Sequence, residues 1–467
     1  MGRYSYVTMT ADERRFDATD LGGDAVDDVL IDDVLIDDSD AAAASRGRRL
    51  SIACVVAFVW LRSMYVLISR PFLTPDTASY RSGQMTRPPL GAALLSWLGD
   101  RPYVALSVVV SSLGFAALAW ALWNPARRRR SMAVTTAIVV YAFIPSITVY
   151  EHWLVPDSLM VGFALMALAL AWRRVPTRWH SAALVVLCLA TTTTKEQGIG
   201  LVLLIALVLL VRRCWRVALV ALAASALLFA TTVMPAANRH GTVIWHEPAD
   251  TQMTMARFRV VIASLMWPDL SPKMAEVSRL SGECGMTMSQ LVLETFNLTN
   301  RRVDFRNCPE LWTAVDQVSQ VDVVLAHLHQ SRHVPLTIER GFAPNMWAMS
   351  LWSQAPFTQR PLMSVDRWLD GFASVLPFIA VALALWRRRG RRLAAIAVLA
   401  TAMAFASALV DPSGQDRHTV AFRVLAFGIA LMSLTESTAP RRAAIDEPDV
   451  DGDPIVSDEL SEKLVQI

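Results

Sequence analysis

The recurrence of long apolar runs constrains this chain more than any other feature. From residue 51 onward, runs of about twenty residues rich in Leu, Ala and Val alternate with short charged connections. A helix of that length crosses the hydrocarbon core of a bilayer. The runs lack the strict apolar–polar alternation of β-barrel strands. The sequence therefore predicts an all-α polytopic membrane protein.

Composition agrees with this class, because 54% of the 467 residues are hydrophobic and the mean hydropathy is +0.37. A soluble chain of this length would be less apolar. We expect about ten transmembrane helices, and the candidate segments are 51–69, 104–123, 132–150, 159–172, 181–194, 200–211, 217–236, 371–386, 393–410 and 424–437.

Arginine clusters predict the orientation of the spans. They include Arg127 to Arg130 after the second span and Arg387 to Arg392 after the eighth. When the spans alternate in direction, every cluster falls on one side, which the positive-inside rule assigns to the cytoplasm. Every acidic residue between positions 51 and 439 except Glu436 then falls in an outside segment. We therefore expect a multi-pass protein of the cell (plasma) membrane with both termini in the cytoplasm.

One outside segment, residues 237–370, is too long for a simple connector and too apolar to be wholly disordered. Apolar residues at helical spacing predict an amphipathic helix within 310–329, and tryptophans within 341–357 predict a helix at the membrane interface. We expect a small helical cap from this segment. It also contains Cys284 and Cys308, which form either a disulfide in an oxidising compartment or two free thiols.

Asp76 is the first candidate for chemistry, because it lies in a polar segment after the first span. Tyr80 follows four residues later and shares a face with Asp76 if the segment is helical. The short apolar stretch 90–98 fits a helix at the interface. A carboxylate at that level is partly desolvated, and its raised pKa would suit a general base. The alternative is a helix-capping aspartate.

The second outside segment contributes Glu151, His152 and Asp157 within seven residues, on the same side as Asp76. The alternatives are that Asp157 caps the following span and that His152 is an interfacial histidine with satisfied hydrogen bonds. Three ionisable groups so close together nevertheless favour a site.

The third outside segment places Lys195 against the positive-inside trend. A lysine there requires an anionic partner, which is either a phosphate group or the neighbouring Glu196. The last outside segment adds further bases, Arg417, His418 and Arg423, with Asp416 as a structural partner.

Acids and bases thus come from four segments on one face of the membrane. Transfer of a sugar from a polyprenyl-phosphate donor needs this layout. The lipid tail stays in the bilayer, the phosphate at the interface needs cations, and the acceptor hydroxyl needs a carboxylate base. Direct attack at the anomeric carbon inverts its configuration.

Four motifs resemble those of the GT-C glycosyltransferases, in particular bacterial lipid-A aminoarabinose transferases and protein O-mannosyltransferases. The resemblance covers roughly residues 51–236 and 411–437. In chain order, the motifs are Asp76-x-x-x-Tyr80 followed by Arg87-Pro88-Pro89-Leu90, then Leu154-x-Pro156-Asp157-Ser158-Leu159, then Thr194-Lys195-x-x-Gly198, and finally Arg417-His418.

The resemblance implies a GT-C-like fold with Asp76 as the catalytic base. It implies that Glu151 and Asp157 are catalytic supports or acceptor contacts.

The family commonly has two adjacent acids in the first segment, whereas Thr77 follows Asp76 here. We therefore expect no obligatory metal, and the need for a divalent cation stays open. The predicted substrate-binding residues are Tyr80, Arg87, His152, Lys195, Glu196, Arg417, His418 and Arg423, of which Arg87, Lys195 and Arg417 are implied near the donor phosphate.

These inferences divide the chain into five parts. The expected parts are a disordered acidic cytoplasmic tail at 1–50, an N-terminal transmembrane catalytic module at 51–236, an exoplasmic loop domain at 237–370, C-terminal transmembrane helices at 371–437 and a second disordered acidic tail at 438–467.

Two other functions remain open. One is a transporter or lipid flippase, which is disfavoured because ionisable residues within the spans are almost limited to Arg62. The other is a non-catalytic GT-C-like membrane protein. The expected partners are the bilayer, a lipid-linked sugar and a glycan, lipid or protein acceptor, and no nucleic acid. The arginine- and alanine-rich usage indicates a GC-rich bacterial genome, and we expect a protein of the cell envelope.

Overall fold

The structure is a computed structural model of the 467-residue chain. It divides into two compact units, Met1–Cys54 and Val55–Ile467, and the described part of the first unit is the beginning of a single helix. The residues that the structure describes are 38–68, 71, 77–81, 87–173, 177–235, 260–261, 263–265, 267–285, 308–319, 321–323, 325, 363–410 and 415–437.

The described residues are helical and contain no β-strand. The helices before residue 236 are α1 (Asp38–Leu67), α2 (Thr77–Arg81), α3 (Pro89–Leu98), α4 (Asp100–Leu122), α5 (Arg128–Phe143), α6 (Pro145–His152), α7 (Asp157–Trp172), α8 (Arg178–Thr194), α9 (Gly198–Val211) and α10 (Trp215–Leu228), which the π-helix η3 (Phe229–Val233) prolongs. The later helices are α13 (Pro272–Glu283), α15 (Pro309–Asp316), α19 (Met363–Arg387), α20 (Arg391–Val410) and α21 (Gln415–Ser437), with the 3-10 turns η2 (Pro125–Arg127) and η5 (Pro268–Leu270).

Three helices among the described residues are long and apolar enough to cross a membrane. They are α4, α10 with η3, and α21 from Thr419 to Ser437. Shorter apolar helices accompany them at Ile52–Leu67, Pro89–Leu98, Asp157–Trp172, Gly198–Val211 and Gly371–Arg387. The predicted total of about ten spans therefore stays a prediction, while the all-helical, apolar architecture is confirmed for the described residues.

The third predicted span, 132–150, is not one helix. Helix α5 ends at Phe143, Ile144 is extended (φ −67°, ψ 142°), and α6 begins at Pro145. Proline has no N–H to donate and disfavours the helical conformation of the residue before it. The prediction of a continuous span is therefore wrong, and the break gives a separate short helix that ends with Glu151 and His152.

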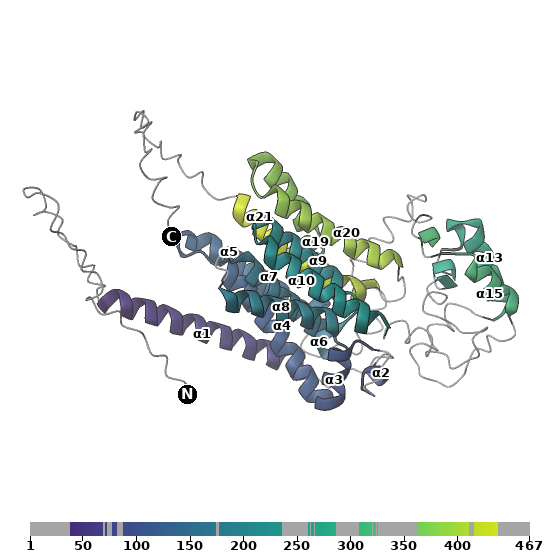
Figure 1. Ribbon diagram of the computed structural model, residues 1–467, viewed down its shortest axis with the longest axis horizontal. Helices are drawn as coiled ribbons and strands as arrows, with labels where there is room; N and C mark the ends of the chain where they lie inside the picture. Colours follow the sequence, from purple (N-terminus) through teal and green to yellow (C-terminus); the bar gives the residue numbers. More distant parts are fainter. Residues whose placement is uncertain are drawn as a thin grey trace, which may run out of the picture. The chain divides into compact units, whose positions relative to one another are not determined.

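A bundle forms the main core, and we call α1 from Val55 onward, α3–α10 and α19–α21 the helix bundle. Helix α7 packs against α4, α8 and α9, and α21 packs against α7, α19 and α20. Figure 1 shows α4, α7, α8, α9 and α10 running side by side. Nearly every described side chain of α21 is buried, so this helix lies inside the bundle, and the core joins it to the apolar faces of its neighbours.

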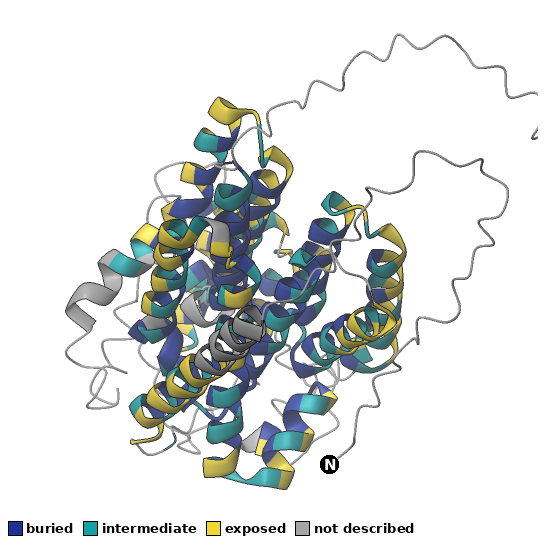
Figure 2. Cartoon of the chain, turned by 90° about the vertical axis from the view of Figure 1, so that its left-hand side faces the viewer, coloured by how far each residue is buried: buried dark blue, intermediate teal, exposed yellow. Residues whose placement is uncertain are grey.

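The outward faces of the bundle are also apolar. Figure 2 shows buried residues where the helices face one another and exposed residues on the opposite sides. The exposed ones include Trp60, Leu61, Leu219, Leu227 and Phe378. Large apolar patches of this kind would be unfavourable in water and are expected where a helix faces lipid.

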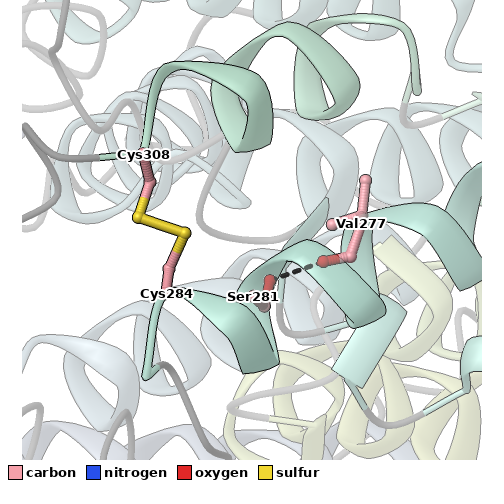
Figure 3. Close-up of a disulfide and its surroundings, with 4 residues drawn as sticks. All are labelled: Val277, Ser281, Cys284 and Cys308. Atoms are coloured by element: carbon pink, nitrogen blue, oxygen red, sulfur yellow. Dashed lines mark hydrogen bonds between the residues drawn. A yellow bond between two sulfur atoms is a disulfide. The ribbon is translucent and has the colours of Figure 1, made fainter.

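The disulfide region, by which we mean the described residues between 260 and 325, has a separate apolar core. Cys284 and Cys308 form a disulfide with a Cα–Cα distance of 6.2 Å (Figure 3). The bond joins the end of α13 to the start of α15, and Ser281 on α13 donates a hydrogen bond of 2.7 Å to the Val277 carbonyl. These links give a small helical unit with an interior of its own.

The amphipathic helix predicted within 310–329 is shorter than expected. Helix α15 ends at Asp316, and although Val315 is buried, Val321 is 64% exposed and Leu325 is 46% exposed. The apolar spacing therefore predicted the buried face correctly only in its first half. The interfacial helix predicted at 341–357 lies outside the described residues.

Candidate functional site

The first and second outside segments of the sequence meet in the structure. Asp76 lies outside the described residues, but its neighbour Thr77 begins α2. The Thr77 hydroxyl donates a hydrogen bond of 3.3 Å to the carbonyl of Leu154, and both residues are buried. The chain next to the predicted base is therefore anchored on the segment that carries Glu151 and Asp157.

Tyr80 and Arg87 form a second contact within the first segment. Tyr80 is 1% exposed, Arg87 is 8% exposed, and the Arg87 guanidinium carbon lies 4.6 Å from the centre of the Tyr80 ring. A guanidinium over an aromatic face is held by a cation–π interaction. The motif Asp76-x-x-x-Tyr80 and the Arg87-Pro88-Pro89 motif are thus joined by their side chains, and Pro89 starts α3 at a position that proline favours.

Helix α3 brings the third outside segment to the same place. A Cβ added to Gly91 would lie 2.8 Å from Cβ of Pro156 and 2.9 Å from the carbonyl oxygen of Thr194. Only glycine allows α3, the start of α7 and the end of α8 to approach so closely. Three segments that are far apart in sequence therefore converge around Gly91.

The charged residues of the second and third segments pair with each other. Asp157 is fully buried, Lys195 is 3% exposed, and the Lys195 Nζ forms an ion pair with Asp157 Oδ1. Either charge alone would be costly to bury, whereas the pair compensates both. The anionic partner of Lys195 in this structure is thus Asp157, which was not among the two predicted partners, phosphate and Glu196.

Local structure explains how Lys195 reaches Asp157. The four threonines that end α8 donate hydrogen bonds to carbonyls one turn earlier, such as Thr192 to Cys188 and Thr194 to Ala190. The next helix, α9, starts at Gly198, where an added Cβ would lie 2.1 Å from the Thr191 carbonyl oxygen. This tight turn leaves Lys195 between the two helices and directs it into the protein.

Glu151 forms the second buried ion pair of the site. Its carboxylate lies 2.6 Å from the Arg62 guanidinium, and neither residue has exposed surface. The sequence singled out Arg62 as a rare charge within a span. In the structure it pairs, with the carboxylate at the end of α6.

A small cavity of about 10 Å³ lies beside the two buried carboxylates. This volume accommodates about one water molecule and no sugar ring. Glu151 and Asp157 therefore line a space that is too small for a sugar in this structure, and their predicted role as supports or acceptor contacts stays a prediction. The lining residues come from α4, α6, α7 and α21 and are Ser111, Ile147, Tyr150, Glu151, Asp157, Ser158, Val161, Val420 and Val424.

The other candidates differ in burial. His152 is 3% exposed, and burial lowers the pKa of its imidazole to about 4, so it is neutral at pH 7. Arg423 is 5% exposed on α21, and Glu196 is half-buried. The side chains of Arg417 and His418 lie outside the described part of α21.

Sequence reasoning missed the serines of α4, Ser111 and Ser112, both of which contact Arg62.

The described residues contain no candidate metal site. Among the residues that the structure describes, no group of three or more His, Cys, Asp and Glu side chains is placed to hold a metal ion. Asp76 lies outside that set, so the need for a metal in the proposed reaction stays open.

Comparisons with known proteins give limited information. No protein-family model matches the chain, and no curated protein matches it. Two crystal structures of ArnT from Cupriavidus metallidurans are retrieved, one bound to undecaprenyl phosphate with 15% identity and one in the apo state with 16% identity. Each alignment covers 84% of this chain and 78% of the other, with a TM-score of 0.29. A score this low does not establish a shared fold, so the proposals below rest on the residues of this chain.

Proposed function

We propose that this protein is an inverting membrane glycosyltransferase, which moves a sugar from a polyprenyl-phosphate donor to an acceptor hydroxyl at the outer face of the membrane. The convergence of the outside segments carries the proposal. Thr77 contacts the Leu154 carbonyl, and Asp157 pairs with Lys195, so the first and third outside segments both contact the second. Four GT-C-like motifs lie on these segments and on α21.

In the proposed reaction, the carboxylate of Asp76 accepts the proton of the acceptor hydroxyl. The hydroxyl oxygen attacks the anomeric carbon, and the bond between that carbon and the phosphate oxygen breaks. Polyprenyl phosphate leaves with the bonding electrons, and the configuration at the anomeric carbon inverts. Nearby cations stabilise the negative charge on the leaving phosphate, and we assign this role to Arg87, Lys195 and Arg417.

The buried pairs have a different role in this proposal. Asp157 orients Lys195, and Arg62 orients Glu151. Fixed charges of this kind lower the reorganisation that the reaction requires, because they are already in place before the substrate binds. Both termini are proposed to lie in the cytoplasm, with the disulfide region on the outer side, where an oxidising environment preserves the Cys284–Cys308 bond.

Substitution of the proposed base tests the function. Membranes that contain the Asp76→Asn variant and a radiolabelled polyprenyl-phosphate sugar should transfer label on the order of 10²- to 10⁴-fold more slowly than wild type, the range for loss of a general base. Asp100→Asn is the matched control, because Asp100 belongs to the same outside segment but is exposed and paired with Arg81 at 2.7 Å. Full transfer by Asp76→Asn would remove Asp76 from the chemistry.

A non-catalytic membrane protein is the second candidate. It is favoured by Thr77, which stands where the family commonly has a second acid. Wild-type membranes that bind a polyprenyl-phosphate sugar and release no transferred label to any glycan, lipid or protein acceptor of the host would favour this candidate over the enzyme.

A further inference from the structure

Arg62 is a fully buried charged residue on the apolar helix α1. The residues around it on α1 are apolar and open to the surroundings, since Trp60 is 59% exposed and Leu61 is 53% exposed, whereas Arg62 has no exposed surface. Val66, one turn further, is also buried, in a cluster with Tyr80 and Leu95 of the first outside segment. One face of α1 therefore packs inward, and Arg62 is the charged group on that face.

The Arg62 guanidinium contacts the end of α5, where the predicted third span is interrupted. Arg62 Nε donates a hydrogen bond of 2.8 Å to the carbonyl of Ala142, which lies in the last turn of α5. The final carbonyls of a helix have no partner within the helix, and its C-terminus carries partial negative charge. Arg62 therefore stabilises the end of α5 at the position where Pro145 interrupts the span.

Further contacts fix the guanidinium from the side of α4. Nη1 lies 3.1 Å from Ser111 Oγ and 3.0 Å from Ser112 Oγ, and the guanidinium carbon lies 5.1 Å from the centre of the Phe115 ring. The planar fork of an arginine can satisfy such a set of directions at once, whereas the single ammonium of a lysine cannot. Arg62 thus joins α1, α4 and α5 in one arrangement.

The remaining contact leads toward the proposed site. Nη2 lies 2.6 Å from Glu151, whose carboxylate lines the small cavity that Asp157 also lines. Asp157 in turn holds Lys195. The small cavity is therefore lined by one residue of each ion pair, Glu151 at the end of α6 and Asp157 at the start of α7.

We propose that Arg62 is a positioning residue, which holds α1, and with it the described part of the first outside segment, against the second segment. This inference rests on the proposed function, because it assigns Arg62 the task of placing the first outside segment relative to Glu151 and Asp157. Arg62 touches no substrate in this proposal. Its effect passes through the cluster of Val66 with Tyr80 and Leu95 to the first outside segment, and through Glu151 to the cavity that Asp157 also lines.

The test must separate positioning from simple stability. Removing one partner leaves the other charge buried and unpaired, so Arg62→Met alone is expected to be the less stable variant. Arg62→Met with Glu151→Met removes both charges and should recover most of the thermal stability. In the double variant, apolar side chains of similar size replace the pair but carry no directional contacts to α4, α5 or α6.

Cross-linking reports the position of the segments without any activity measurement. With the free cysteines Cys54, Cys188 and Cys214 replaced, the yield of a disulfide between Thr77→Cys and Leu154→Cys reports whether the two segments stay adjacent, because the Thr77 hydroxyl contacts the Leu154 carbonyl. We expect the yield to fall several-fold in the folded Arg62→Met/Glu151→Met variant. Removal of the exposed Arg81–Asp100 pair by Arg81→Met and Asp100→Met is the control, and it should leave the yield unchanged.

Activity supplies the second measurement, in the chain with its native cysteines. The double variant should lose kcat on the order of 10²-fold, the effect of a misplacement of about 1 Å, with the KM for the donor nearly unchanged. Arg62→Lys, which keeps the charge but not the fork, should recover only part of kcat. A wild-type cross-linking yield in the folded double variant would overturn the inference, whatever the rate. If the wild-type protein proves inactive, the proposed function fails while the cross-linking result still decides the position of the segments.

Discussion

Two groups of ion pairs among the described residues differ in environment. In the helix bundle, Arg62–Glu151 and Lys195–Asp157 join residues far apart in sequence, and all four side chains are buried. In the disulfide region, Arg279 pairs with Glu276 and Glu283, one helical turn away on α13, and all three side chains are about half exposed. The chemistry of the pairs is the same, but their surroundings are not.

The difference shows what each region relies on. Water and dissolved salt screen the pairs of α13, and such surface pairs contribute little to stability. No such screening reaches the bundle pairs, so each charge there depends on its partner. The disulfide region is instead held by its apolar core and by the Cys284–Cys308 bond. Buried ion pairs therefore join different helices at the bundle end near the proposed site, whereas the ion pairs described on α13 stay within one helix.

Breaking a bundle pair should have the largest effect. Lys195→Met leaves the Asp157 carboxylate buried without this partner, and we expect a loss of about 3–5 kcal/mol in the free energy of unfolding. Lys195→Met combined with Asp157→Leu removes both charges and should recover most of that loss. The measurement is thermal or denaturant unfolding of the purified protein in detergent.

The Lys195→Met/Asp157→Leu variant shows whether the lost stability comes from an unpaired buried charge. If Lys195→Met and the double variant are equally destabilised, the cost comes from lost packing around the side chains and not from an uncompensated charge. The bundle pairs would then resemble those of α13 more than their burial indicates.

Much of the bundle follows from sequence because apolar length and periodicity are local properties. The apolar runs predicted α4, α10 and α21 as helices of spanning length. The break at Pro145 was missed, although a proline after an apolar run is a visible signal. The shorter helix at α15 was missed for another reason, since Val321 and Leu325 continue the apolar spacing but do not lie on a buried face. The spacing of apolar residues does not show how far along the chain a partner surface extends to bury them.

The site is harder to predict, because pairing depends on which segments meet. The sequence indicated that Lys195 needs an anion and that Arg62 is an exception within its span. It gave no means to choose Asp157, which lies 38 residues from Lys195, or Glu151, which lies on another helix. Contacts over such separations are set by the packing of α3, α7 and α8 around Gly91. The GT-C-like motifs predicted which segments come together, and the partner of each charge emerged only from the fold.

Glycine packing offers the second test of the comparison. In Gly198→Ala, the new Cβ would lie 2.1 Å from the Thr191 carbonyl oxygen, so α8 and α9 must move apart. We expect a loss of about 1–3 kcal/mol in the free energy of unfolding, typical of overpacking in a tight core. Because the turn carries Lys195, the shift should also lower the transfer rate, measured in the same membranes as Asp76→Asn.

Gly282 in the disulfide region is the matched control. It lies near the end of α13, is exposed, and has no atom within 4 Å of an added Cβ. Alanine is favoured over glycine in a helix by about 1 kcal/mol, so Gly282→Ala should stabilise the region slightly. Opposite signs at the two glycines would support the contrast between a tightly packed turn and a loosely surrounded helix, and equal signs would contradict it.

The smallest effect is expected from the exposed pairs of α13. Arg279 donates hydrogen bonds to Glu276 at 2.6 and 2.9 Å, and these lower the pKa of the Glu276 carboxyl. A lowered carboxyl pKa favours the folded state only above its unfolded value, and this contribution disappears as the pH falls through the lowered pKa. Because both groups are exposed, Arg279→Ala should leave the unfolding midpoint at pH 7 unchanged within error. A midpoint shift as large as that of Lys195→Met, persisting at high salt, would show that burial is not what distinguishes the two regions.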